Sequence, residues 1–201
     1  MITTVYFVRH AQPDRGPDSP YTDKTYPLTD KGKSDSHKVT AFFKDKKIQA
    51  VISSPYVRAV DTVKGVAKAI RAEIELVDDF RERAITDRWL EIEDFKKFAV
   101  RQWEDFDYKL PAGESAREVQ ERNMKALYQV LEDHGGKNIV IGCHGMSLST
   151  VINFYDKNHT NKQLAEMPMP WICKMTFDGR ELKKMENIDI LRNMLQKGKK
   201  F

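Results

Sequence analysis

The chain has few cysteines: among its 201 residues, only Cys143 and Cys173 carry a thiol. Two cysteines this far apart provide neither the paired spacing of a zinc site nor the framework of a disulfide-rich fold. We therefore expect reduced thiols and a cytoplasmic protein. Because Cys143 ends a short apolar run, we expect it to pack in the core rather than to act as a nucleophile.

Long hydrophobic runs are also missing. No uninterrupted apolar stretch approaches the roughly 20 residues that cross a bilayer, so we expect no membrane attachment. The first residues, Met1–Thr4, lead straight into a short apolar run. They lack the basic segment and the longer apolar core of a secretory signal, which agrees with a cytoplasmic protein.

An excess of one charge is equally absent. The 34 basic residues nearly balance the 30 acidic residues, which leaves a net charge of +4. Basic residues gather only near the C-terminal end, at Lys197, Lys199 and Lys200, and we interpret them as a solvated end. Because the chain has no basic stripe with interleaved aromatic residues, we expect no nucleic-acid partner.

What the sequence does contain is a regular alternation of strand-like and helix-like segments. Short runs rich in valine and isoleucine predict buried strands at about 3–8, 48–52, 74–77 and 139–141. Segments with helical spacing follow them, opening near Thr29, Ser54-Pro55, Ser115 and Ser147. This order predicts an α/β three-layer sandwich, with a mainly parallel sheet and helices on both of its faces.

Later segments add detail to this architecture. Two runs at 171–177 and 181–185 flank Asp178-Gly179, which predicts a hairpin and hence an antiparallel edge of the sheet. The charged and aromatic segment at about 80–110 is interpreted as a helical insertion within one domain that spans 1–201. The proline-rich segment 11–27 is an unusually long loop, and its length favours a functional role.

Two of the predicted strands end in a histidine. The first strand runs directly into Arg9-His10, and the fourth leads to His144. Because ligands bind at the carboxyl edge of an open parallel sheet, these two histidines can meet in one pocket. Arg58, in the first turn of the helix predicted to open at Ser54-Pro55, reaches the same edge near a helix start, where anions bind well.

Two arginines and two histidines at one edge indicate a site for a phosphate or a carboxylate. A guanidinium presents a planar fork of donors that matches two phosphate oxygens. An isolated Arg-His pair is more often a packed histidine beside a surface arginine, but Arg58 and His144 favour the anion site. No further cluster of histidine, cysteine or acidic residues has metal-ligand spacing, so we expect no metal.

These residues lie in motifs that resemble those of the histidine phosphatase superfamily, the phosphoglycerate mutase-like enzymes. Residues 9–12 (Arg-His-Ala-Gln) resemble its Arg-His-Gly signature, and residues 27–32 (Pro-Leu-Thr-Asp-Lys-Gly) resemble its Leu-Thr-x-x-Gly element. Residues 53–62 (Ser-Ser-Pro-Tyr-Val-Arg-Ala-Val-Asp-Thr) are similar to its Ser-Ser-Pro-x-x-Arg-Ala-x-x-Thr block. Residues 113–115 (Gly-Glu-Ser) and 144–145 (His-Gly) match two later elements. Five elements in the family's order cover most of the chain.

The resemblance implies a mechanism. His10 would attack phosphorus and form a phosphohistidine, which divides a difficult transfer into two easier steps. Arg9, Arg58 and His144 would hold the phosphoryl oxygens and offset the charge that develops in the transition state. The resemblance implies no cofactor.

Two further residues are assigned through the same resemblance. Glu82 matches the family's acid position and would protonate the leaving group before it activates water. The alternative interpretation of Glu82 is a surface glutamate between two arginines. Gln12 occupies a position that often carries Glu or Gln in the family, and we expect it to face the substrate.

Some positions depart from the family pattern. Ala11 replaces the usual glycine, and Gly16 stands near the place of a phosphate-binding asparagine in many members. Asp87-Arg88-Trp89 is a poor substitute for the Trp-Glu-Gly segment that commonly follows the acid. In the segment 80–110, substrate specificity is therefore least transferable from the family to this chain.

The sequence leads to a hypothesis and two alternatives. We expect a metal-independent phosphatase that acts on a small phosphorylated substrate, a phosphomonoester. A phosphoglycerate mutase would use the same residues, but the chain lacks the long insertions associated with dedicated mutases. A third alternative is a module that binds a phosphorylated ligand without turnover, and retention of His10, Arg58, His144 and a candidate acid argues against it. The oligomeric state is left open.

Overall fold

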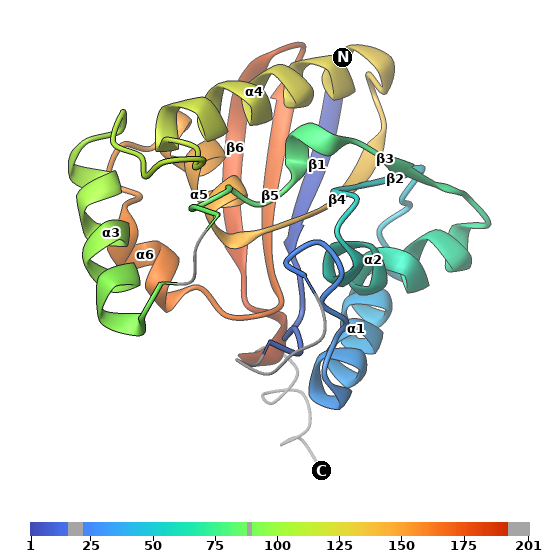
Figure 1. The fold of residues 1–201 in the computed structure, drawn as a ribbon. Coiled ribbons are helices and arrows are strands. Elements are labelled where there is room, and N and C mark those ends of the chain that lie inside the picture. The colour runs from blue at the N-terminus through green and yellow to red at the C-terminus, as the bar shows by residue number, and fades with distance from the viewer. Residues whose placement is uncertain (16–21, 88–89, 193–201) are drawn as a thin grey trace.

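A six-stranded mixed sheet forms the centre of the chain (Figure 1). The computed structural model describes residues 1–15, 22–87 and 90–192. The strands are β1 Ile2–Arg9, β2 Ala50–Ser53, β3 Ile74–Leu76, β4 Asn138–Cys143, β5 Trp171–Asp178 and β6 Glu181–Ile188. In the order β3-β2-β4-β1-β5-β6, the first four pair in parallel, whereas β5 and β6 run antiparallel to their neighbours. The predicted mainly parallel sheet with an antiparallel edge is therefore confirmed.

Helices cover both faces of this sheet. They are α1 Asp30–Phe43, α2 Val57–Ile70, the short 3₁₀ helix η1 Asp78–Phe80, α3 Ile92–Glu104, α4 Ala116–Asp133, α5 Gly145–Tyr155 and α6 Asn161–Glu166. Successive side chains of a strand point to opposite faces. Accordingly, Val5 and Phe7 of β1 pack with residues of α4 and α5, while Tyr6 and Val8 pack with residues of α1 and α2. The predicted three layers follow from this alternation.

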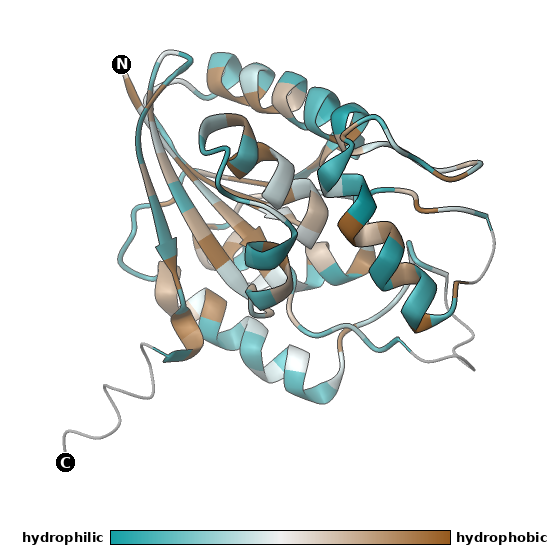
Figure 2. Cartoon of the chain, turned by 90° about the vertical axis from the view of Figure 1, so that its left-hand side faces the viewer, coloured by the Kyte–Doolittle hydropathy of each residue, from teal (hydrophilic) through white to brown (hydrophobic). Residues whose placement is uncertain are grey.

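Hydropathy along the helices agrees with their positions. The outer helices carry both hydrophilic and hydrophobic residues, as expected for helices half buried against a sheet (Figure 2). The helix α5 differs, because every residue from Gly145 to Asn153 is buried. In the part of the chain that the structure describes, no helix is long and apolar enough to span a bilayer.

Several helix caps and one turn are found where local patterns in the sequence predict them. The Thr29 hydroxyl accepts a hydrogen bond from the Gly32 amide at the start of α1, and Ser115 forms a full capping box at the start of α4. A Cβ on Gly32 would lie 2.3 Å from the Gln12 carbonyl oxygen, which explains the glycine of the Leu-Thr-x-x-Gly element. Gly179 has a φ of +59° in the β5–β6 turn, so the predicted hairpin is confirmed.

The predicted start of α2 at Ser54-Pro55 is wrong. The helix begins at Val57, and Tyr56 is its N-cap residue. The Ser54 hydroxyl lies 2.8 Å from Nε2 of His144, a residue of another segment. It also accepts a hydrogen bond from the Tyr56 amide, at 3.3 Å. Arg58 nevertheless lies in the first turn, as the sequence predicts.

The predicted start of α5 near Ser147 is also too late. The helix begins at Gly145, so His144 is itself the N-cap residue. The N–H groups of Met146 and Ser147 are satisfied by the carboxylate of Glu82, which comes from a distant part of the sequence. Because a remote carboxylate accepts from the first amides of α5, the helix needs no local capping residue, and the sequence gives no signal of its start.

The segment 80–110 contains α3, which lies beside α6 in Figure 1. The ring of Trp103 in α3 and the ring of His159, just before α6, have centroids 6.4 Å apart. No pattern in the sequence predicts α6, because a helix of six residues is too short to show a helical period.

We predict that Ser115→Ala lowers the free energy of unfolding by about 1 kcal/mol, because the Glu118 amide loses its hydroxyl acceptor 3.1 Å away. Urea denaturation measures the change. The matched control is Ser34→Ala on the exposed side of α1, where alanine has the higher helix propensity and no loss is expected. An unchanged unfolding midpoint for Ser115→Ala would contradict the importance of this cap.

Candidate active site

The two histidines predicted to converge lie side by side. Arg9 is the last residue of β1 and Cys143 is the last residue of β4, and the two face each other across this parallel pair. The next residue on each strand is a histidine, so His10 and His144 leave the same edge of the sheet. Their ring centroids are 5.2 Å apart, and both side chains are buried.

His10 is held by its backbone and by its ring. Its amide donates to the Cys143 carbonyl at 3.0 Å, and the following amide, of Ala11, donates to the Thr62 hydroxyl at 2.9 Å. Burial lowers the pKa of His10 well below its ordinary value, and the positive charge of Arg58 lowers it further. The ring is therefore neutral. Because Nδ1 lies 2.8 Å from the Ala11 carbonyl, which only accepts, Nδ1 carries the proton and Nε2 keeps its lone pair.

His144 is also a neutral imidazole. Burial lowers its pKa well below the ordinary value, and Arg58 and His10 act in the same direction. Its Nε2 lies 2.8 Å from the Ser54 hydroxyl, and its ring packs edge-on against Tyr56 with centroids 5.1 Å apart. Its other nitrogen, Nδ1, is buried and has no hydrogen-bond partner within the described residues.

Arg58 is completely buried at the start of α2. One of its N–H groups donates to the main-chain carbonyl of Asp23, and its Nη2 forms an ion pair with the Asp23 carboxylate at 3.2 Å. Its guanidinium also lies 5.0 Å from the ring centroid of Tyr56. Burial lowers the pKa of Arg58, while Asp23 opposes that shift. Its Nε is buried and has no acceptor among the described residues.

Arg9 supplies the second guanidinium. Its Nη1 donates to the Met167 carbonyl, and its buried Nε has no acceptor in the described part of the chain. A Cβ on Gly145 would lie 3.2 Å from Nη2 of Arg9, so glycine after His144 allows the guanidinium to approach the start of α5. Burial lowers the pKa of Arg9, and the nearby Glu82 carboxylate opposes this shift.

The structure places Glu82 at the N-terminus of α5, beside this group. Its Oε2 accepts from the Met146 amide at 3.2 Å, and its Oε1 accepts from the amides of Ser147 at 3.3 Å and Arg83 at 2.9 Å. A carboxylate at this position also interacts favourably with the helix dipole. Glu82 is half-buried and hydrogen-bonded at this helix start, and its role as an acid stays a prediction.

Gln12 contacts the start of α1 rather than the two imidazoles. Its side-chain oxygen is 3.3 Å from the Thr29 hydroxyl, and its carbonyl accepts from the Thr29 amide at 3.1 Å. The residue is exposed and joins the loop after β1 to the start of α1. The structure thus brings together His10, His144, Arg9, Arg58 and Glu82, while Gln12 contacts the α1 cap.

The arrangement agrees with a match to a known family. Residues 5–185 match the family model of the histidine phosphatase superfamily, branch 1. The chain belongs to this superfamily.

Other comparisons show what this histidine phosphatase resembles. It is 26% identical over 153 residues to the uncharacterized phosphatase PhoE of Bacillus subtilis, covering 75% of this chain and 76% of that protein. The solved structure of Bacillus stearothermophilus YhfR superposes with a TM-score of 0.74 at 22% identity, covering 90% of this chain and 94% of the other. A mycobacterial glucosyl-3-phosphoglycerate phosphatase gives 0.73 at 16% identity, covering 93% and 97%. The two structures establish the fold.

Sequence reasoning missed three groups that contact the site. Asp23, which binds Arg58, lies in the long loop 11–27, where no pattern distinguishes it from the neighbouring polar residues. Ser54 was interpreted as a helix start, and the amides at the beginning of α5 carry no sequence signal. Gly16, the Arg88-Trp89 pair and the basic end at 197–200 lie outside the described residues.

Cys143 precedes His144 at this edge of the sheet, but its side chain belongs to the core. Cys143 is fully buried in the core beneath the site, and burial raises the pKa of its thiol well above the ordinary value. It is therefore a packed thiol rather than a thiolate nucleophile. Within the described ranges, no group of three or more His, Cys, Asp or Glu side chains is arranged to hold a metal ion.

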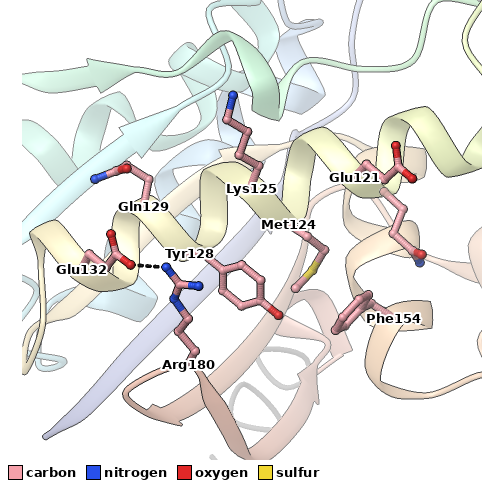
Figure 3. A pocket seen from close by; sticks show the side chains of 9 residues that line it. Glu121, Met124, Lys125, Tyr128, Gln129, Glu132, Phe154 and Arg180 are labelled. Atoms are coloured by element: carbon pink, nitrogen blue, oxygen red, sulfur yellow. Dashed lines mark hydrogen bonds and ion pairs between the residues drawn. The ribbon is translucent and has the colours of Figure 1, made fainter.

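A groove with a volume of about 450 Å³ lies elsewhere, along α4, the end of α5 and the β5–β6 turn (Figure 3). In Figure 3, Arg180 of the turn lies beside Tyr128 and pairs with Glu132 of α4. The Arg180 guanidinium is 4.9 Å from the Tyr128 ring centroid. The groove contains none of the five site residues, so it is separate from the histidine edge.

The burial of neutral His10 predicts a pH-dependent stability. The unfolded chain binds a proton at this histidine below about pH 6.5, whereas the folded chain does not until its lowered pKa is reached. Stability at this group is therefore lost as the pH falls below 6.5, by up to about 1.4 kcal/mol per pH unit. His10→Gln should flatten the pH dependence of the free energy of unfolding, measured by urea denaturation between pH 6.5 and 5, by up to this slope.

The matched control for this measurement is His37→Gln on the exposed side of α1, which should keep the wild-type slope. An unchanged slope in His10→Gln would show that His10 is charged in the folded chain.

Proposed function

We propose that this chain is a metal-independent phosphatase that hydrolyses a small phosphomonoester through a phosphohistidine on His10. The observation that carries the proposal is the pair of neutral imidazoles beside the guanidiniums of Arg9 and Arg58, whose buried Nε atoms have no acceptor among the described residues. A buried donor that lacks an acceptor costs about 1–3 kcal/mol. The oxygens of a phosphoryl group would supply acceptors to Arg9 and Arg58 and would gain charge-assisted hydrogen bonds.

The first chemical step starts from the tautomer of His10. Its Nε2 lone pair attacks phosphorus, the bond between phosphorus and the ester oxygen breaks, and the departing alkoxide takes a proton from the Glu82 carboxyl group. The result is a phosphohistidine and a free alcohol. Three backbone N–H groups fix the position of the Glu82 carboxyl group, and a general acid acts only within hydrogen-bond reach of the atom that it protonates.

The second step returns the enzyme to its starting state. Glu82, now a carboxylate, takes a proton from a water molecule whose oxygen attacks phosphorus. The bond between phosphorus and Nε2 breaks, and its electron pair returns to His10, so inorganic phosphate and a protonated Glu82 are formed. In both steps, Arg9, Arg58 and His144 stabilise the charge on the phosphoryl oxygens.

Substrate binding involves an exchange at Arg58. Its guanidinium is paired with the Asp23 carboxylate, and a phosphoryl group would take the place of that carboxylate. Membership of the histidine phosphatase superfamily and similarity to the phosphatase PhoE both support a phosphatase enzyme. The mycobacterial structural relative, a glucosyl-3-phosphoglycerate phosphatase, supports the choice of a small phosphorylated substrate.

We predict that His10→Ala lowers kcat for 4-nitrophenyl phosphate by more than about a thousandfold, because the group that bonds to phosphorus is lost. Nitrophenolate release measures the rate, and circular dichroism checks that the variant is folded. The control is His37→Ala, which should keep the wild-type rate. Wild-type turnover by His10→Ala would contradict the assignment of the nucleophile.

Two further assays separate the proposed phosphatase from its alternatives. Activity should persist after prolonged incubation with a chelator, and 3-phosphoglycerate should release inorganic phosphate without accumulation of 2-phosphoglycerate. Accumulation of 2-phosphoglycerate would identify a mutase. Binding of phosphate esters without any turnover, across a panel of aryl and alkyl phosphates, would identify a binding module.

A further inference from the structure

The Gly-Glu-Ser element at 113–115 matches the family pattern, but it takes no part in the chemistry proposed above. It lies in the connection between α3 and α4, and its carboxylate contacts the loop that carries Glu82. Oε1 of Glu114 accepts from Nη2 of Arg81 at 2.7 Å, and Oε2 accepts from the Ala84 amide at 2.9 Å. One carboxylate thus binds the chain on both sides of Glu82.

Arg122, in the second turn of α4, completes this attachment. Its Nε and Nη2 bind the two oxygens of Glu114 at 2.8 and 3.0 Å in a bidentate pair. Its Nη1 donates to the carbonyls of Asp79 at 2.6 Å and Arg81 at 2.9 Å. Burial alone would raise the pKa of Glu114, but the bonds from Arg122 and Ala84 outweigh it and lower the pKa, so the pair is ionised.

A third attachment comes from α3. The buried side chain of Gln102 accepts a hydrogen bond from Arg83 and donates to the Glu114 carbonyl at 2.8 Å. A Cβ on Gly113 would lie 2.1 Å from the Ile85 carbonyl oxygen, so only glycine allows this approach to the loop. The residues on both sides of Glu82 are therefore bound to Glu114, Arg122 and Gln102. The carboxylate of Glu82 itself binds the start of α5.

We propose that Glu114, held by Arg122, is a positioning residue that places the Glu82 carboxyl group against the leaving group of the substrate. The inference rests on the proposed role of Glu82 as the acid. Residues 81–87 lie outside the helices and strands, so the regular hydrogen bonds of a helix or sheet do not fix the backbone of Glu82. An acid must lie within hydrogen-bond reach of the oxygen that it protonates, and a displacement of about 1 Å can cost about a hundredfold in rate.

The test is the dependence of the rate on the leaving group. A nitrophenolate departs without help from an acid, whereas an alkoxide needs a proton. The informative constant is kcat/KM, because it reports formation of the phosphohistidine and not its later hydrolysis, which is common to both substrates. Glu114→Gln should therefore lower kcat/KM for an alkyl ester such as glycerol 2-phosphate by about a hundredfold and leave kcat/KM for 4-nitrophenyl phosphate little changed. Glu82→Gln should show the same selective loss of kcat/KM, and to a larger extent.

The matched control is Glu118→Gln. Glu118 is also a hydrogen-bonded carboxylate at the start of α4, where it accepts from the Ser115 amide at 2.8 Å and does not bind the Glu82 loop. Glu118→Gln should lower the urea midpoint without changing the ratio of kcat/KM for glycerol 2-phosphate to kcat/KM for 4-nitrophenyl phosphate. Arg122→Lys keeps the positive charge but cannot form the bidentate pair, so it provides a second variant with the same expected selective loss if Glu114→Gln does not fold.

The outcomes distinguish the two proposals. An equal loss of kcat/KM on both substrates in Glu114→Gln, together with a selective loss in Glu82→Gln, would overturn the positioning role and leave the phosphatase mechanism intact. Equal losses of kcat/KM in Glu82→Gln itself would overturn the role of Glu82 as the acid. A selective loss in both, absent from Glu118→Gln, supports the positioning role.

Discussion

The parallel pairing of β1 with β4 determines the geometry of the whole site. Its register sets Arg9 opposite Cys143, so the residues that follow, His10 and His144, leave the sheet at the same level. A shift of one residue in either strand would turn its side chains to the other face. The apolar side chains of both strands pack into the two cores on either side of the sheet, so the forces that fold the protein also fix the distance between the two rings.

Burial governs the electrostatics of this edge. Two imidazoles taken out of water beside a buried arginine remain neutral, since a further positive charge there would be both desolvated and repelled. The two guanidiniums remain as cations because arginine holds its proton even when burial lowers its pKa. The result is a neutral His10 ring with a lone pair on Nε2, surrounded by groups that attract anions.

The sequence predicted the parts of the structure that local patterns encode. Valine-rich runs identified the strands, and the capping residues Thr29 and Ser115 identified two helix starts, because these signals depend on neighbouring residues alone. The start of α5 was misplaced because its first amides are satisfied by Glu82, a partner from a remote segment. Asp23 was missed for a related reason: its contact with Arg58 is formed only by the folded chain and has no pattern in the sequence.

The contact between Asp23 and Arg58 has a consequence for product departure in the proposed reaction. A phosphoryl group that binds this guanidinium would replace the Asp23 carboxylate, so part of its attraction would be cancelled by the lost ion pair. When inorganic phosphate leaves, the Asp23 carboxylate would pair with Arg58 again. Such an internal competitor would weaken inhibition by product and favour turnover over tight retention.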